Sequence, residues 1–304
     1  MLLVFGSINL DIGFDAERLP APGETVLGRG WRMSPGGKGA NQAHAAQRYG
    51  LATRLVGAVG DDAFAEQALT QLRAAGVDLG ALQRLPGQTG CAGIMVDAHG
   101  ENQIVVAPGV NLELRASHVS DALLASSSAV LLQMECDADQ NRALIERAKA
   151  QGCQVLLNNA PARPLAQDLL RALDVLIVNQ IELAATAQRS GIASGDATAQ
   201  VQELARRHAL TVVLTLGAQG VLASASGGEL LRLPALPVPV VDTTGAGDTF
   251  AGVFAAALVE QRPLTDALTR ASVAAGLACS RIGAQTAQPD RAEIEAALHR
   301  LPPS

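Results

Sequence analysis

The chain has 304 residues, of which 48% are hydrophobic and 17% are charged, and its net charge is −6. At this length one large core buries about three quarters of the surface that the unfolded chain exposes, so we expect a single domain over residues 1–304. The acidic balance argues against nucleic acid as a partner, because a nucleic-acid-binding face normally shows clustered Lys and Arg.

The sequence also argues against a membrane or secreted protein. No run of 18 apolar residues appears, and residues 1–11 lack the basic start of a signal peptide, so we expect no membrane partner. The four cysteines are scattered without a C-x-x-C pair or a metal-ligand spacing. We interpret them as reduced thiols and expect a cytoplasmic protein.

Apolar runs of strand length alternate with helical patterns along most of the chain. We expect strands at residues 2–8, 53–60, 129–135, 154–160, 175–180 and 211–217. We expect helices at residues 39–50, 62–76, 139–152 and 199–209, and a helical C-terminal quarter from Ala246. Continuous apolar strands joined by helices indicate an α/β fold whose central sheet is mostly parallel and covered on both faces.

Two segments interrupt this alternation. Residues 10–34 contain Pro, Gly and alternating apolar positions but no helical pattern, and residues 89–109 read as two strands around the turn "DAHGEN". Together they predict a small β-sheet that projects from the body. A lid over a binding site is the functional interpretation, and an edge hairpin without function is the alternative.

The stretch "DTTGAGDTF" at residues 242–250 carries the clearest chemical signal. Glycines allow the backbone to approach a phosphate closely, and a helix N-terminus attracts anions. We therefore expect Gly245, Ala246 and Gly247 to form an anion hole, and Asp248 to take a proton from an attacking hydroxyl. Alternatively, Asp248 only caps a helix.

A second glycine cluster, "PGGKGANQA" at residues 35–43, also opens a helix. It is not a Walker P-loop, because Gly39 follows Lys38 where that motif has Ser or Thr. No G-x-G-x-x-G follows the first strand, so a dinucleotide-dependent oxidoreductase is disfavoured.

With these two glycine signatures about 200 residues apart, the chain resembles the ribokinase-like (PfkB-type) carbohydrate kinases over essentially its whole length. The resemblance implies a three-layer α/β/α body, a β-sheet lid, and transfer of the γ-phosphoryl group of ATP to a sugar. The stretches "GSINLD", "PGETV", "NNAPAR" and "RIGAQ" are most similar to the members that act on ribose. The expected reaction is therefore the conversion of D-ribose to D-ribose 5-phosphate.

By the same resemblance, Asp248 is the catalytic base and residues 245–247 are its anion hole. The residues implied in sugar binding are Asn9, Asp11, Gly36, Gly37, Lys38, Asn41, Glu135 and Asp248. Those implied in ATP binding are Asn179, Thr215, Leu216, Gly217, Ala218, Gln219, Gly220, Gly247 and Ser272. Glu182 is implied to support Mg²⁺ through water.

The resemblance also implies a site for a monovalent cation, with K⁺ as the activator. It maps to Asp242, Thr244, Ala278, Arg281, Gly283 and Ala287. Ala287 departs from the family pattern, which usually has Ser there. A homodimer formed through the lid is a further implication, and exposed strand edges would permit it.

Other functions remain open at this point. The same chemistry with another sugar, deoxyribose or a nucleoside as acceptor is the nearest alternative. A non-catalytic regulator that binds a sugar or nucleotide would require a lost base or anion hole, and the sequence retains both.

Overall fold

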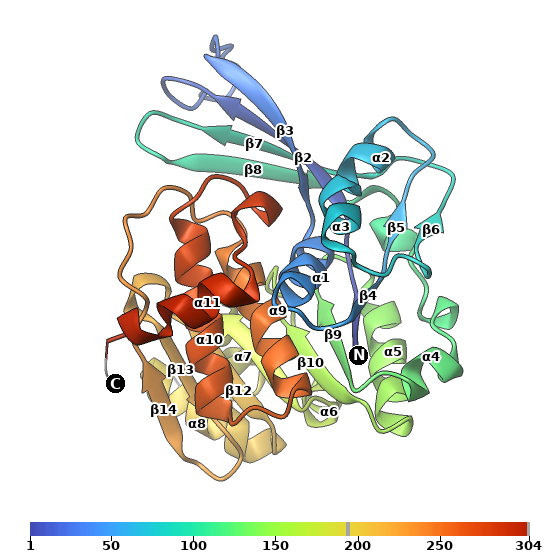
Figure 1. Ribbon diagram of the computed structural model, residues 1–304, viewed down its shortest axis with the longest axis vertical. Coiled ribbons are helices and arrows are strands. Elements are labelled where there is room, and N and C mark those ends of the chain that lie inside the picture. Colours follow the sequence, from blue (N-terminus) through green and yellow to red (C-terminus); the bar gives the residue numbers. More distant parts are fainter. Residues whose placement is uncertain (193–194, 303–304) are drawn as a thin grey trace.

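An eight-stranded sheet with helices on both faces forms the body of the protein (Figure 1). The structure is a computed structural model and describes residues 1–192 and 195–302. The strand order is β14-β13-β12-β11-β10-β9-β1-β4, and all neighbours from β12 to β4 are parallel. The strands are β1 (Leu2–Phe5), β4 (Thr53–Val56), β9 (Ala129–Gln133), β10 (Gln154–Asn158), β11 (Val175–Asn179), β12 (Thr211–Thr215), β13 (Val221–Ser224) and β14 (Leu230–Leu233).

Side chains of each strand alternate between two hydrophobic cores. In β1, Leu2 and Val4 belong to one core, whereas Leu3 and Phe5 belong to the other. A strand that is buried on both faces is apolar at every position, and this is why continuous apolar runs predicted the sheet. The prediction of a mostly parallel sheet between two helical layers is confirmed.

The two helical layers are made from different parts of the chain. The layer on the Leu2 side contains α1 (Lys38–Arg48), α2 (Phe64–Ala68), α3 (Thr70–Ala75), α9 (Ala246–Val259), α10 (Leu264–Cys279) and α11 (Arg291–Ala297). The layer on the Leu3 side contains α4 (Asp121–Ala125), α5 (Ala138–Ala150), α6 (Gln167–Ala172), α7 (Gln180–Arg189) and α8 (Ala197–His208). Among the described residues, no helix has the length and apolarity that a membrane span needs.

Several predicted boundaries were wrong. The strands expected to end at residues 8, 135, 160, 180 and 217 end at 5, 133, 158, 179 and 215. Most residues beyond these ends lie in loops at the carboxyl edge of the sheet, and Gln180 begins α7. Ligands of parallel sheets bind at this edge. The helix expected at residues 62–76 is divided at Leu69, next to Thr70, whose hydroxyl donates to the Gln67 carbonyl.

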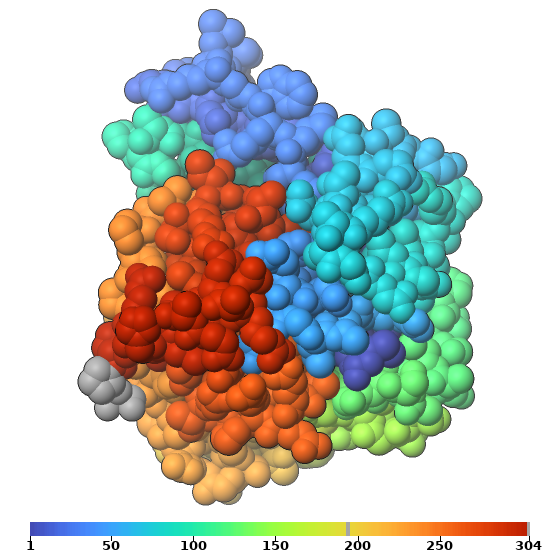
Figure 2. All heavy atoms as spheres, viewed as in Figure 1, coloured from blue at the N-terminus to red at the C-terminus, as the bar shows by residue number. Residues whose placement is uncertain are grey.

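A four-stranded sheet of order β3-β2-β7-β8 projects from the body, as Figures 1 and 2 show at the top of the molecule. We call it the lid. Its strands are β2 (Asn9–Asp15), β3 (Gly30–Gly36), β7 (Gly90–Val96) and β8 (Asn102–Ala107), so the predicted small β-sheet is confirmed. The remaining elements are short: β5 (Ala58–Val59), β6 (Gln83–Arg84), and 3-10 helices at Gly109–Glu113, Ala116–His118, Gly217–Gln219, Gln285–Ala287 and Leu298–Arg300.

Candidate active site

Asp248 lies in the first turn of α9, next to an open stretch of backbone. Gly245 caps the helix with φ 71°, and a Cβ there would lie 3.0 Å from the Cβ of Ala284, so this position requires glycine. A Cβ placed on Gly247 would have no neighbour within 4 Å, which leaves that backbone accessible to a ligand. The backbone of Ala246 is less available to a ligand, because its N–H already donates to the Thr243 carbonyl at 3.2 Å.

The two glycine signatures meet at Asp248. Its carboxylate is only 6% exposed; Oδ2 accepts from Asn41 Nδ2 at 2.9 Å, and Oδ1 accepts from Gln42 Nε2 at 3.0 Å. The negative charge of Asp248 is the largest cause of the raised pKa of Lys38, so this ammonium group stays protonated at neutral pH. Residues about 200 positions apart in the chain thus form one charged cluster.

Close backbone contact explains the glycines of the N-terminal signature. A Cβ on Gly39 would lie 2.5 Å from the carbonyl carbon of Gly6, so only glycine lets α1 begin directly against the end of β1. Gly37 precedes the helix with φ 88°, and a Cβ there would lie 2.8 Å from the backbone nitrogen of Asn9. This packing holds Lys38 at the carboxyl edge of the sheet.

Glu135 follows β9 and faces the start of α1. Its Oε2 accepts from Ser7 Oγ at 2.5 Å and from the Lys38 backbone N–H at 3.0 Å. Within the described part of the chain, Oε1 has no hydrogen-bond donor. The structure therefore brings this predicted sugar-binding acid into the cluster, with one oxygen engaged and the other available.

Asp11 brings a carboxylate from the lid into the same cluster. A Cβ on Gly36 would fall 2.2 Å from Asp11 Oδ2, so glycine at position 36 makes room for this side chain. Burial, with Glu135 and Asp248 nearby, raises the pKa of Asp11 to about 7, although Lys38 opposes the rise. Its Oδ1 is buried and finds no donor among residues 1–192 and 195–302. Such an oxygen is costly to bury, and the hydroxyls of a polyol would supply the missing donors.

Asn9 is also at the site, but its side chain is already held by the protein. Asn9 is 3% exposed, and its Oδ1 accepts from Asn111 Nδ2 at 2.8 Å. Asn111 in turn bonds the backbone N–H and carbonyl of Ile8. Asn111 was not predicted from the sequence, and it holds the segment that joins β1 to the lid strand β2.

The predicted nucleotide-binding residues gather at the neighbouring strand ends. Asn179 and Thr215 are paired in the register of β11 and β12, and Thr215 opens the loop of residues 215–220. Asn179 and Glu182 form a capping box at the start of α7, with hydrogen bonds of 2.8 to 3.0 Å. Burial raises the pKa of Glu182, and its charge acts on Lys38, so this edge adjoins the Asp248 cluster.

Two predicted nucleotide-binding residues lie on other elements, Gly247 on α9 and Ser272 on α10. Ser272 is 7% exposed. Its Oγ is buried and has no partner within the described ranges. The side chain is thus enclosed by the helical layer that also contains α9.

Three of the residues mapped to a cation site, Asp242, Thr244 and Gly283, come together. Although burial opposes it, hydrogen bonds from Thr244 and from the Gly283 N–H lower the pKa of Asp242. The Asp242 N–H donates to the Cys279 carbonyl at 3.2 Å, which joins this loop to the end of α10. Ala287 is 1% exposed and offers no side-chain oxygen, and the Arg281 side chain turns away to an ion pair with Glu293. Ala278 is the remaining residue mapped to this site, and its carbonyl already accepts from the Arg281 N–H at 3.1 Å.

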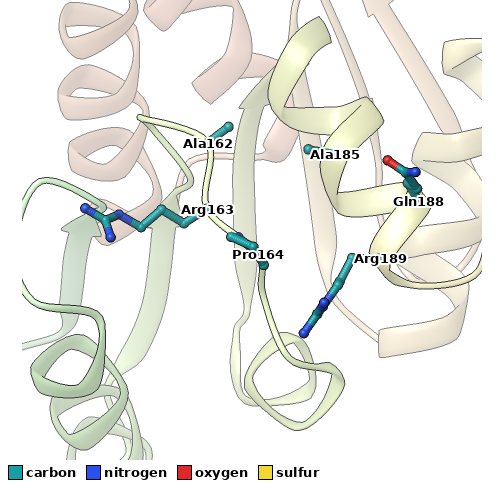
Figure 3. Close-up of a pocket in the computed structure, with 6 residues that line it drawn as sticks. All are labelled: Ala162, Arg163, Pro164, Ala185, Gln188 and Arg189. Atoms are coloured by element: carbon teal, nitrogen blue, oxygen red, sulfur yellow. The ribbon is translucent and has the colours of Figure 1, made fainter.

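A surface cavity of about 560 Å³ is lined by none of the predicted site residues (Figure 3). It is formed by the loop after β10 and by α7. Its two arginines, Arg163 and Arg189, point in different directions in Figure 3, and Arg163 Nε donates to the Met134 carbonyl. The cavity therefore lacks converging polar groups.

Several buried amides of the site were not predicted as site residues. Besides Asn111 they are Gln42, Gln133, Asn158, Gln285 and Gln288. A weak signal was present, because Gln133 and Asn158 are polar residues at the ends of otherwise apolar strands. Such residues usually need a specific hydrogen-bond partner.

Known proteins resemble this chain over nearly its whole length. A family model described as pfkB family carbohydrate kinase matches residues 1–291. The ribokinase of Bacillus subtilis is 36% identical over 299 residues, covering 98% of this chain and 99% of that protein. The ribokinase of Lactococcus lactis is 35% identical over 301 residues, covering 98% and 97%.

Solved structures are similar to the same extent. The ribokinase of Thermotoga maritima superimposes with a TM-score of 0.90 at 32% identity, covering 98% of this chain and 99% of that one. The Arabidopsis thaliana ribokinase complexed with ribose and ATP gives 0.88 at 32% identity, covering 98% of each chain. The matched residues include both glycine signatures and the Asp248 cluster. The chain therefore belongs to the pfkB family of carbohydrate kinases.

Proposed function

We propose that this protein is an ATP-dependent ribokinase, which converts D-ribose to D-ribose 5-phosphate. The observation that carries the proposal is the cluster of Asp11, Lys38 and Glu135 beside Asp248, at the N-terminus of α9. A polyol needs paired donors and acceptors, and the unpartnered Asp11 Oδ1 is an acceptor of this kind. Full-length similarity to two bacterial ribokinases, and to one whose structure holds ribose and ATP, supports the choice of acceptor.

In the proposed reaction Asp248 removes the proton from the 5-hydroxyl group of ribose. The hydroxyl oxygen forms a bond to the γ-phosphorus of ATP, the bond from that phosphorus to the bridging oxygen breaks, and ADP leaves. The open backbone at Gly247 and the N-terminal dipole of α9 would stabilise the negative charge of the transferring group. Phosphoryl transfer asks mainly for such positioning and charge stabilisation.

Magnesium would enter with the nucleotide. Both Glu182 carboxylate oxygens already accept hydrogen bonds from Asn179, so Glu182 suits a contact through water rather than direct ligation. Within the described ranges, no group of three or more His, Cys, Asp or Glu is placed to hold a metal ion. This agrees with Mg²⁺, which keeps several waters and takes few protein ligands.

Potassium would bind beside the anion hole. Asp242, whose pKa is lowered by hydrogen bonds from Thr244 and Gly283, would supply one oxygen donor, and backbone carbonyls of the Ala278–Gly283 segment would supply others. The missing hydroxyl at Ala287 leaves one donor to be replaced by a carbonyl or a water.

We further propose a homodimer formed through the outer face of the lid. The strand register puts Phe14 beside Trp31 on that face, opposite to the face that carries Asp11. Both aromatic residues are exposed, as are Met33 and Val105 at the same side of the sheet. Exposed apolar patches of this kind are typical of association surfaces.

The cytoplasm is the compartment in which we expect the protein to work. All four cysteines are free thiols, as the reducing cytoplasm favours. ATP, the proposed phosphoryl donor, is also plentiful there.

The direct test is release of ADP by the purified protein with ATP, Mg²⁺ and ribose. We expect release that requires the acceptor, with stoichiometric formation of a pentose monophosphate identified by mass spectrometry. Binding of ribose and ATP without turnover would instead indicate a regulator on this fold.

A further inference from the structure

The carboxylate of Asp248 is held from behind by an amide that cannot reach the substrate. Gln42 is 0% exposed, and its Nε2 lies 3.0 Å from Asp248 Oδ1. Asn41, the other amide on this carboxylate, also donates to it and is implied in sugar binding. Gln42 therefore differs from Asn41, because it can affect the reaction only through Asp248.

The orientation of the Gln42 amide is determined by its neighbours. Asn158 Nδ2 donates to the Ile177 carbonyl at 3.1 Å, so Asn158 Oδ1 is the atom that faces Gln42. Because Asn158 Oδ1 is an acceptor, the Gln42 atom that lies 3.0 Å from it must be the donor nitrogen, Nε2. The Gln42 oxygen then points to Gln133 Nε2, which donates to it at 2.6 Å. Asn158 at the end of β10 and Asp248 at the start of α9 thus fix the nitrogen of the Gln42 amide, and Gln133 at the end of β9 fixes its oxygen.

The packing of α1 against α9 makes this contact possible. A Cβ on Gly252 would lie 2.3 Å from the Gln42 carbonyl oxygen, so glycine lets the two helices touch one turn after Asp248. Because the backbones are in contact, the Gln42 side chain reaches the carboxylate within hydrogen-bond distance.

From this geometry we infer that Gln42 is a positioning residue, which orients the Asp248 carboxylate toward the acceptor hydroxyl. This inference rests on the proposed role of Asp248 as the base. A carboxylate offers about four acceptor positions, so each oxygen retains one after its amide bond. Without Gln42 the carboxylate can rotate, and a small misplacement of a reacting group costs on the order of 10²-fold in rate.

The test is a double-mutant cycle between Gln42→Met and Asp248→Asn. Methionine keeps the length of glutamine without the amide. In the native background we expect Gln42→Met to lower kcat by roughly 10- to 100-fold, with the KM for ribose changed less than about threefold. In the Asp248→Asn background, followed with radiolabelled ATP, Gln42→Met should change kcat by less than about twofold, because no base is left to position.

A buried polar side chain away from this amide network provides the control. Thr53 is 2% exposed, and its hydroxyl donates to the Leu51 carbonyl at 2.8 Å. Thr53→Val should lower the melting temperature but affect kcat equally in both backgrounds. Gln42→Glu, which keeps the shape and turns the donor into an acceptor, covers the case in which Gln42→Met does not fold. It should show the same loss, and the same disappearance of that loss in Asp248→Asn.

Two results would overturn the inference. One is a Gln42→Met or Gln42→Glu enzyme with more than half of the native kcat, and the other is an equal loss in both backgrounds, which indicates a structural role. Failure of the proposed function is distinguishable, because Asp248→Asn alone would then retain most of its turnover whatever the changes at Gln42 do.

Discussion

At the scale of single residues, the candidate site brings like charges close together. Asp248, Glu135 and Asp11 all raise the pKa of Lys38, and burial, with Glu135 and Asp248 nearby, raises that of Asp11. One ammonium group does not balance three carboxylates, so the excess negative charge adds to burial in disfavouring the ionised form of Asp11. Sugar hydroxyls would favour the ionised form by donating to the carboxylates, which links substrate binding to charge.

Asp248→Asn should separate catalysis from binding. The amide is nearly isosteric with the acid, so the fold and the affinity for ribose should be retained, but it cannot accept the hydroxyl proton. We expect kcat to fall roughly 10²- to 10⁴-fold. Steady-state kinetics and calorimetric titration with ribose measure the two effects. A variant that keeps more than about a tenth of the native kcat would disprove the assignment of the base.

Without ligand, Asp11→Asn should be more stable than the native protein, and the difference should grow as pH rises. The pKa of Asp11 is about 7 in the folded protein and 3.8 as the ordinary value. Between these values the folded state binds more protons than the unfolded state, so this group's contribution to stability is present below pH 4 and lost as pH rises through 7. Asp11→Asn should not show this loss of stability with pH, and we expect it to bind ribose more weakly.

The measurement is the free energy of unfolding of both proteins, without ligand, at pH 5.5 and pH 8. The advantage of Asp11→Asn over the native protein should grow between the two pH values. A difference that does not change with pH would show that Asp11 is not the group that titrates.

At the scale of elements, the site is the place where helix starts meet strand ends. The parallel sheet was predictable because β1, β9, β10 and β11 are apolar on both faces. The C-terminal limits of these strands were not predictable. After β1, for example, Gly6 to Ile8 are as buried as the strand itself, but the chain bends away there to meet Gly39. Strands β13 and β14 were also missed, because four-residue strands in a hairpin give little periodicity.

The charged part of the site was predictable, whereas the amide network around it was not. Asp248 and Lys38 stand in recognisable glycine-rich signatures. Gln42 finds its partners Gln133 and Asn158 at 91 and 116 positions along the chain, and only the folded sheet brings them together. The roles of the charged residues stay predictions until they are tested.

The loop between Asp242 and the anion hole should respond to potassium. A cation held by Asp242 and nearby carbonyls would order residues that run directly into Gly245, and phosphoryl transfer depends on preordered donors. We expect a higher initial rate when potassium chloride replaces tetramethylammonium chloride at fixed ionic strength. Asp242→Asn should remove this response. A flat response in the native enzyme would mean that the loop is ordered without the ion.

At the scale of the whole molecule, the lid serves two proposed functions on its two faces. One face carries Asp11 into the site, and the other exposes Phe14 and Trp31. Because neighbouring residues of a strand point to opposite faces, the same short strand can contribute to the sugar site and to a dimer interface.

Trp31→Glu should convert a dimer to a monomer. The native protein should scatter light with twice the chain mass of 31.2 kDa, and a charge on the outer face of the lid should prevent association. Ile181→Glu is the matched control, because Ile181 is 76% exposed on α7, outside the lid. A native protein that is monomeric at micromolar concentration would contradict the proposed dimer.

The choice of ribose as acceptor is the central claim. Asp11, Lys38 and Glu135 form a polar site, and the chain has only 2% aromatic residues, so it offers little surface on which the base of a nucleoside could stack. The most direct test compares kcat/KM for ribose, deoxyribose, fructose and adenosine at a fixed, saturating ATP concentration. We expect the highest value for ribose, and faster phosphorylation of fructose or adenosine would contradict ribose as the acceptor.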